Sequence, residues 1–233
     1  VPMAISNCEL ELIIVVMALQ AGLLSLVKAS LTGSIIGNSL FVMGASFLVG
    51  GSHHGVQQFD PREAGRHSVM MILAIAALFL PAAFQVAHPD PFLVEELSVF
   101  FAIVLLLVYG AYIAYSLTDR PEVPLSVTPI EQGARLAPEV APHWKPRTAA
   151  LVLFGSTVAT VIVSEVLVHA VEPMTKVLGL TEFFVGIIIV PIIGNVAEHF
   201  SAVVFAGKNQ MDTALAIAAG SSTQIALLVA PLA

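Results

Sequence analysis

Two glutamates lie within apolar segments of the chain, and each is followed by a Gly-Ser pair at the same distance. Glu11 precedes Gly33-Ser34 by 22 residues, and Glu198 precedes Gly220-Ser221 by 22 residues. Coincidence can produce such a spacing, but an ionised carboxylate in the hydrocarbon core of a membrane costs about 2.5–3.5 kcal/mol. Neither apolar segment contains a Lys or Arg that would pair with its glutamate. We therefore expect a bound cation or a proton to neutralise each carboxylate.

The residues around Glu198 favour a divalent cation with oxygen ligands. Pro191 removes a backbone hydrogen bond and Gly194 loosens the helix, so carbonyl oxygens are freed here. Asn195 lies three residues before Glu198 and is predicted to share its helix face. Ca²⁺ takes six to eight carboxylate, amide and carbonyl oxygens, whereas softer metals prefer sulfur and clustered imidazole, which this pair lacks.

The apolar segment after each glutamate adds further polar side chains. Residues 220–224 read GSSTQ, and Ser221 and Gln224 are three apart, so both are candidates for ligands or for positioning water. The counterpart, residues 33–38, reads GSIIGN and contains a GxxxG spacing. Close helix packing is the favoured interpretation of these glycines, while a role of Ser34 in the site stays open.

Apolar runs of about 20 residues recur along the whole chain, as expected for membrane helices. The chain is 58% hydrophobic and 11% charged, against roughly 25% charged residues in soluble domains. Runs this long and continuous exclude barrel strands, so we predict an all-α transmembrane bundle. Seven segments are expected, at about 10–27, 31–51, 69–87, 97–117, 148–171, 182–206 and 213–233.

The order of these segments predicts two halves of inverted topology. Five crossings separate Glu11 from Glu198, and an odd number inverts the second copy relative to the first, as in many secondary transporters. Residues 1–117 form the first half and 148–233 the second, joined by a linker at 118–147 that holds six prolines. Basic residues predict that the linker is cytoplasmic, since only Lys28 and Lys176 fall on the other side. The cytoplasmic set comprises Arg62, Arg66, Arg120, Arg135, Lys145, Arg147 and Lys208.

At these motifs the chain resembles the Ca²⁺/H⁺ antiporters of the cation/Ca²⁺ exchanger superfamily. The second half resembles that family's second repeat at LGLTEFFVGIIIVPIIGN (178–195), GNVAEH (194–199) and GSSTQIALLVAP (220–231). The first half resembles it at VKASLTGSIIGN (27–38), at the double glycine 50–51 and at QQFD (57–60). The resemblance implies a protein of eleven spans, of which two at each end lie outside this chain.

The resemblance also implies a set of site residues. Glu11 and Glu198 are then the ion-binding acids, with Asn195, Ser221 and Gln224 nearby. The family's first motif, Gly-Asn-Ala-x-Glu, aligns with residues 7–11, and its asparagine falls on Cys8. Asn7, one residue earlier, is therefore a lower-ranking candidate.

Four further residues are candidates for gating or for a vestibule. His199 neighbours Glu198 but points to another helix face, which suits a gating role. Glu165, His169 and Glu172 share one face of the fifth segment at i, i+4 and i+7. A solvated helix end is the favoured interpretation of these three, and a cation-attracting vestibule is the alternative.

Paired carboxylates in one cavity predict an antiport mechanism. Their mutual repulsion is relieved either by Ca²⁺ or by protons, so the two occupants exclude one another. We expect a secondary active transporter that exchanges Ca²⁺ for H⁺ by alternating access near the membrane midplane. Ca²⁺ is its transported substrate and H⁺ its counter-ion. We expect the transporter to lie in the lipid bilayer and to have neither enzymatic activity nor an organic cofactor.

Other functions remain as alternatives. A Na⁺/Ca²⁺ or other cation/Ca²⁺ exchanger would share the inverted repeat, and a cation channel or seven-helix receptor would match the segment count. A retinal pump is excluded because residues 213–233 lack a lysine, and the net charge of −7 argues against nucleic acid. We expect a prokaryotic cell membrane, with a vacuolar membrane as the alternative. The oligomeric state is open, and a homo-oligomer is one option.

Overall fold

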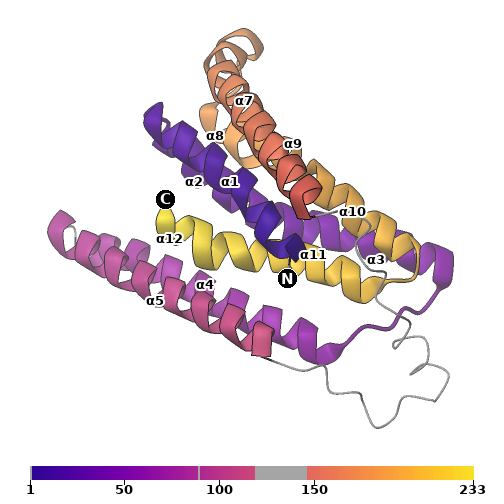
Figure 1. The fold of residues 1–233 in the computed structure, drawn as a ribbon. Helices are drawn as coiled ribbons and strands as arrows, with labels where there is room; N and C mark the ends of the chain where they lie inside the picture. The colour runs from indigo at the N-terminus through magenta and orange to yellow at the C-terminus, as the bar shows by residue number, and fades with distance from the viewer. Residues whose placement is uncertain (1, 89, 119–145) are drawn as a thin grey trace.

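The computed structural model describes residues 2–88, 90–118 and 146–233, and within these ranges every regular element is a helix (Figure 1). The predicted all-α fold is confirmed. The first part of the chain forms α1 (Pro2–Gln20), α2 (Leu24–Ile36), the π-helical turn η1 (Gly37–Val42), α3 (Met43–His54), α4 (Pro61–Ala87) and α5 (Pro91–Thr118). The second part forms α7 (Pro146–Leu178), α8 (Glu182–Phe184), η2 (Val185–Ile189), α9 (Val190–Gly194), α10 (Val196–Gly207), α11 (Met211–Gln224), η3 (Ile225–Val229) and α12 (Ala230–Leu232).

Helices form in all seven predicted apolar segments, and most of these helices are long enough to cross a membrane. The described residues contain five such stretches: Leu24–His54, Pro61–Ala87, Pro91–Ser116, Phe154–Val171 and Met211–Leu232. The helices Glu182–Gly194 and Val196–Gly207 meet at a bend of 58° and form a sixth span if they are counted together. The described part of α1 contributes a shorter apolar stretch, Glu11–Gln20. Residues 119–145, which make up most of the predicted linker, lie outside the described residues.

The first predicted boundary is wrong because the apolar run continues through a turn. The expected segment 10–27 crosses a break, since α1 ends at Gln20 and α2 begins at Leu24. Gly22 lies in the break with φ of 75°, a left-handed conformation that glycine adopts without steric cost. The next helix therefore starts earlier than expected and continues through η1 to His54.

Helices from the two parts of the chain interleave. In Figure 1, α4 lies beside α5 and α1 lies beside α7, while α11 lies between these two pairs. The helix α10 packs against both α3 and α11, and α2 packs against η2. The core that surrounds α1 and α2 consequently takes apolar side chains from both parts, including Val15, Leu26, Val190 and Val229.

Two glycines allow α2 to approach the second part of the chain at backbone distance. A Cβ atom at Gly33 would collide with the carbonyl oxygen of Ile187, and one at Gly186 would lie 2.7 Å from the Cβ of Ala29. Close packing therefore accounts for Gly33. Gly37, the other glycine of the GxxxG spacing, has open space at its Cβ position.

Candidate ion-binding site

The Glu11 carboxylate lies where α1, α2 and the bent helix at 182–207 meet. Its side chain is 3% exposed. The oxygen Oε1 accepts a hydrogen bond from Ser34 Oγ at 2.7 Å and another from Asn195 Nδ2 at 2.7 Å. Asn195 Nδ2 also lies 3.1 Å from Ser34 Oγ and 3.1 Å from the carbonyl oxygen of Pro191. One amide thus joins the first part of the chain to the second at a buried carboxylate.

A break in the helix directs Asn195 towards Glu11. Asn195 separates α9 from α10 with φ of −104° and ψ of 13°. Pro191, the second residue of α9, has no backbone N–H, and Gly194 is the last residue of that helix, so the helix is broken here as the sequence suggests. Glu198, which the sequence places on a shared helix face with Asn195, lies in the first turn of α10. The Asn195 amide bonds to Glu11 in the other half of the chain.

Glu198 has the same kind of partner as Glu11. It is 8% exposed, and Ser221 on α11 and Glu11 both lie near its carboxylate. Glu11 bonds to Ser34, and Glu198 lies near Ser221, so each glutamate neighbours the serine that follows 23 residues later, as the repeated spacing in the sequence indicates.

Each glutamate also presents one buried oxygen without a protein donor. Among the residues that the structure describes, Oε2 of Glu11 and Oε2 of Glu198 have no hydrogen-bond partner. A buried, unpaired carboxylate oxygen is costly unless a cation or a proton occupies it. The described residues contain no group of three or more His, Cys, Asp or Glu suited to a metal. The candidate site combines two carboxylates with nearby amide and hydroxyl groups, a hard donor set of the kind that Ca²⁺ binds.

A second layer of polar contacts supports the site, and Asn38 is the residue that sequence reasoning missed. Asn38, in η1, donates from Nδ2 to Ser221 Oγ at 3.1 Å, and its Oδ1 lies 2.9 Å from His199 Nε2. Next to it, Ser39 Oγ donates to Ser222 Oγ at 3.0 Å. The signal was present, because Asn38 lies four residues after Ser34 in an apolar segment and is expected to share its helix face. His199 thus reaches the layer around Ser221 through Asn38.

The other residues that the sequence suggested for the site are Gln224, Glu165, His169, Asn7 and Glu172. Gln224 is buried at the end of α11, three residues after Ser221. Glu165 and His169 are exposed on α7, and within the described part of the chain neither forms a hydrogen bond or ion pair with the two glutamates. The side chains of Asn7 and Glu172 are outside the described set. The vestibule therefore stays a prediction.

The chain matches a known protein family. A family model described as sodium/calcium exchanger protein matches residues 2–118 and 148–233. The chain belongs to this family. Membership in this exchanger family confirms the resemblance noted in the sequence, and the family is one of membrane transporters.

The chain is similar to characterised and solved members of this exchanger family. It is 43% identical over 233 residues to a Ca²⁺/H⁺ antiporter of Aphanothece halophytica and 40% identical over 222 residues to the Ca²⁺/H⁺ antiporter ChaA of Bacillus subtilis. Each alignment covers 95% of this chain and 62% of the relative. The solved structure of native YfkE superimposes with a TM-score of 0.77 at 37% identity, covering 97% of this chain and 62% of that one. The chain thus spans about three fifths of these relatives.

Proposed function

We propose that this chain holds the exchange site of a Ca²⁺/H⁺ antiporter. One observation supports this most directly: within the described residues, two buried glutamates each present an unpartnered oxygen. Each glutamate lies beside a serine of the following helix, and Asn195 links the two halves at Glu11. The relatives named Ca²⁺/H⁺ antiporters support the choice of ions.

The proposed ligands of Ca²⁺ come from both halves. Glu11 and Glu198 supply carboxylate oxygens, and Asn195 and Ser221 are next to them. Ser34 and Gln224 complete the proposed set, with water filling the six to eight positions that Ca²⁺ requires. His199 acts through Asn38 as a gating residue, while Glu165, His169, Glu172 and Asn7 remain proposed contributors to the approach of the ion.

The paired glutamates make Ca²⁺ and protons alternative occupants. At ~4 Å and an effective dielectric of about 20, two negative charges repel by about 4 kcal/mol. Ca²⁺ removes this repulsion by pairing with both carboxylates, and protons remove it by neutralising them. An empty, doubly charged site is unfavourable in the membrane, so one occupant leaves only when the other can replace it. Residues 1–117 and 148–233 form the two halves, joined by a cytoplasmic linker at 118–147, and one helix bundle would rock against the other around the site.

The bacterial relative favours a prokaryotic cell membrane as the location. The Bacillus subtilis antiporter is 40% identical to this chain, whereas vacuolar cation/proton exchanger 3 of rice is 34% identical. A vacuolar membrane remains the alternative location.

Transport in vesicles tests the proposal. We would reconstitute the protein and measure Ca²⁺ uptake under an imposed pH gradient. Glu198→Gln keeps the shape of the side chain and removes its charge, and Glu95→Gln, at an exposed position of α5, is the matched control. We expect uptake by the unsubstituted protein and by Glu95→Gln, and loss of uptake in Glu198→Gln. Uptake that persists in Glu198→Gln would refute the site.

A Na⁺ gradient tests the second candidate. The matching family model is named for sodium/calcium exchange, so Na⁺ is the specific competitor of H⁺ as the counter-ion. Ca²⁺ uptake that requires a Na⁺ gradient and does not depend on a pH gradient would assign the chain to Na⁺/Ca²⁺ exchange.

A further inference from the structure

A cavity of about 470 Å³ lies between η1, α3, α4 and α11, and neither Glu11 nor Glu198 lines it. Its volume falls within the range of about 300–1,000 Å³ that is usual for sites of small organic molecules. The lining residues of α4 run from Asp60 to Ile72, which is roughly 18 Å of helix at 1.5 Å per residue. The space is therefore large enough for a whole small molecule rather than for a single ion.

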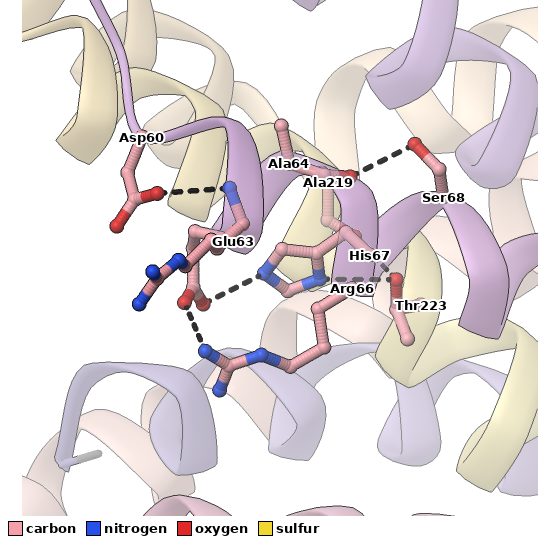
Figure 2. Close-up of polar contacts among 9 residues, drawn as sticks. Asp60, Glu63, Ala64, Arg66, His67, Ser68, Ala219 and Thr223 are labelled. Atoms are coloured by element: carbon pink, nitrogen blue, oxygen red, sulfur yellow. Dashed lines mark hydrogen bonds and ion pairs between the residues drawn. The ribbon is translucent and has the colours of Figure 1, made fainter. Parts of the chain in front are cut away.

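The wall of this cavity is mostly apolar. The hydroxyls of the two helices that face each other across it bond within their own helices (Figure 2). Ser68 Oγ donates to the carbonyl oxygen of Ala64 at 2.8 Å, and Thr223 Oγ1 donates to that of Ala219 at 2.7 Å. The apolar lining side chains include Met43, Phe47, Phe59, Met71, Ile72 and Leu215.

The three carboxylates that line the cavity lie together at one end of it. Asp60 and Glu63 are at the start of α4, and Asp212 is at the start of α11. The backbone N–H of Asp60 donates to Asp212 Oδ1 at 2.6 Å, so the two helix starts are joined at this acidic end. Glu63 shares its charge with Arg66, 2.8 Å away. Within the part of the chain that the structure describes, no Lys or Arg lines the cavity.

This distribution of polarity does not suit a path for water or for Ca²⁺. A cavity with apolar walls stays dry, because water needs two to four polar partners. Ca²⁺ needs six to eight oxygen ligands, and beyond the acidic end the wall offers only the hydroxyls of Ser39, Ser68 and Thr223. The buried ring of His67 already has Glu63 and Thr223 as neighbours, at 3.5 Å and 3.4 Å.

A molecule with an apolar body and one positive charge matches both parts of the cavity. Its body would replace water along α4 and α11, where the wall is apolar. Its charge would lie at the end formed by Asp60 and Asp212. Phe47 and Phe59 also line the cavity, and aromatic side chains attract organic cations as well as apolar groups. A neutral molecule would gain only the first of these contributions.

We propose that this cavity binds amphipathic organic amines, with the ammonium group beside Asp60 and Asp212 and the apolar body between α4 and α11. The site is distinct from the pair of glutamates, and the inference goes beyond the proposed exchange function. It requires no movement of α4 relative to α11, because the ligand occupies space that already exists between them.

Binding of labelled phenylbutylammonium to the protein in lipid nanodiscs tests the proposal. Phenylbutanol has the same apolar body without the charge, and empty nanodiscs measure the uptake of each compound by lipid. We expect saturable binding of phenylbutylammonium to the protein, about fivefold tighter than that of phenylbutanol, since ion pairs at exposed acids contribute only modestly.

Two asparagine substitutions test the acidic end. Asp60→Asn combined with Asp212→Asn removes both charges, while the side-chain oxygens can still accept from the backbone N–H groups of Arg62 and Asp60. We expect phenylbutylammonium to bind about fivefold more weakly and phenylbutanol to be unaffected. Asp90→Asn is the matched control, because Asp90 is exposed and accepts from a backbone N–H at the start of α5 in the same way.

A bulky substitution tests the apolar part. Ala216 is an exposed lining residue of α11, so Ala216→Phe should fill the cavity and abolish binding of both compounds. Ala76→Phe, at an exposed position of α4 outside the lining, is the control. Thermal unfolding in detergent checks that each variant is folded. A ring-azide derivative of phenylbutylammonium provides a second measurement on the original protein, and on illumination it should label peptides of α4 and α11.

Equal binding of phenylbutylammonium to the original protein and to the double asparagine variant would refute the role of the two acids. Azide labelling confined to other helices, or binding that persists in Ala216→Phe, would refute the cavity as the site. Loss of binding in Glu198→Gln would place the amine at the ion site and overturn the proposal. None of these measurements uses Ca²⁺ transport, so failure of the proposed exchange function would leave their outcomes unchanged.

Discussion

At the residue scale, each buried glutamate divides its two oxygens between the protein and the ion. Oε1 of Glu11 receives two protein donors, while Oε2 of Glu11 and Oε2 of Glu198 have none in the described part of the chain. The protein thereby orients each carboxylate and leaves one oxygen of each for a transported ion. We therefore expect substitutions of the hydrogen-bond donors and substitutions of the glutamates to affect Ca²⁺ transport differently.

Removing a serine donor should weaken Ca²⁺ binding without abolishing it. Ser34→Ala and Ser221→Ala each remove a hydrogen bond to a carboxylate, worth about 1.5–3 kcal/mol. We expect the Ca²⁺ concentration for half-maximal transport to rise about tenfold in each variant. Thr32→Ala is the control, because Thr32 is exposed on the same helix as Ser34 and, within the described residues, its hydroxyl donates only to the carbonyl oxygen of Lys28. An unchanged Ca²⁺ dependence in both serine variants would remove them from the site.

Replacing the bridging amide by an acid should be more damaging. Asn195→Asp substitutes an acceptor for the Nδ2 donor that now lies 2.7 Å from Glu11 Oε1. Two carboxylates at this distance cannot both be ionised, so they would share a proton. We expect transport at neutral pH to fall more than tenfold, with part of it recovered as pH rises and the shared proton leaves. Asn209→Asp, in the exposed connection before α11, is the matched control, and equal activities of the two variants would contradict this role of Asn195.

The sequence singled out both glutamates together with Ser34 and Ser221, but not the contact between Ser34 and Glu11 or the bond from Asn195 to Glu11. Equal spacing marked these residues as a repeated pattern and left the role of Ser34 open. Asn195 was expected on one helix face with Glu198, and a bond to Glu11 was not considered. The break at Asn195 and the close approach of α2 to η2 are tertiary features, so a local pattern could not reveal that its amide reaches Glu11.

At the scale of elements, glycine controls how close the two halves can lie. Gly33 has no room for a side chain against the backbone of η2, whereas Gly37, one turn later, faces open space. The contact matters for the site because the next residue, Ser34, is the donor to Glu11.

Gly33→Ala should therefore destabilise the fold and displace Ser34. Overpacking of this kind costs about 1–3 kcal/mol. We expect a lower thermal unfolding temperature in detergent together with reduced Ca²⁺ transport. Gly37→Ala should leave both measurements close to those of the original protein. If the two variants unfold at the same temperature, α2 and η2 are not in backbone contact.

The helix boundaries were harder to predict than the helices. Apolar composition is continuous across residues 20–24, and only the backbone of Gly22 marks the break. The π-helical turns η1, η2 and η3 were not predicted either, because a wider turn leaves no distinct signal in an apolar run. η1 nevertheless contains Asn38, which bonds to Ser221.

At the scale of the whole molecule, loops of the two parts meet at the end where α3 and α10 finish. His54 Nε2 lies 2.8 Å from the carbonyl oxygen of Gly207, and Gln57 Nε2 donates to the carbonyl oxygen of Ala206 at 3.1 Å. The distribution of basic residues predicts that this end faces the cytoplasm.

Labelling of single cysteines tests that orientation. With Cys8 replaced by Ser, we would introduce Gln58→Cys before α4 and His88→Cys after it, both at exposed positions. We expect a membrane-impermeant maleimide to label His88→Cys in intact cells and Gln58→Cys only after the membrane is opened. The reverse pattern would invert the predicted topology.

The interleaving of the two halves also has a consequence for biosynthesis. Ser34 and its partner Asn195 are separated by 161 residues of chain. At about 5–20 residues per second, a ribosome needs roughly 8–32 s to make that interval. During this time Ser34 of α2 and Asn38 of η1 enter the membrane before Asn195, His199 and Ser221 exist. The nascent first half thus depends on the insertion machinery or on membrane chaperones to shield polar side chains from lipid, and it is a natural substrate for quality-control proteases whenever synthesis stalls.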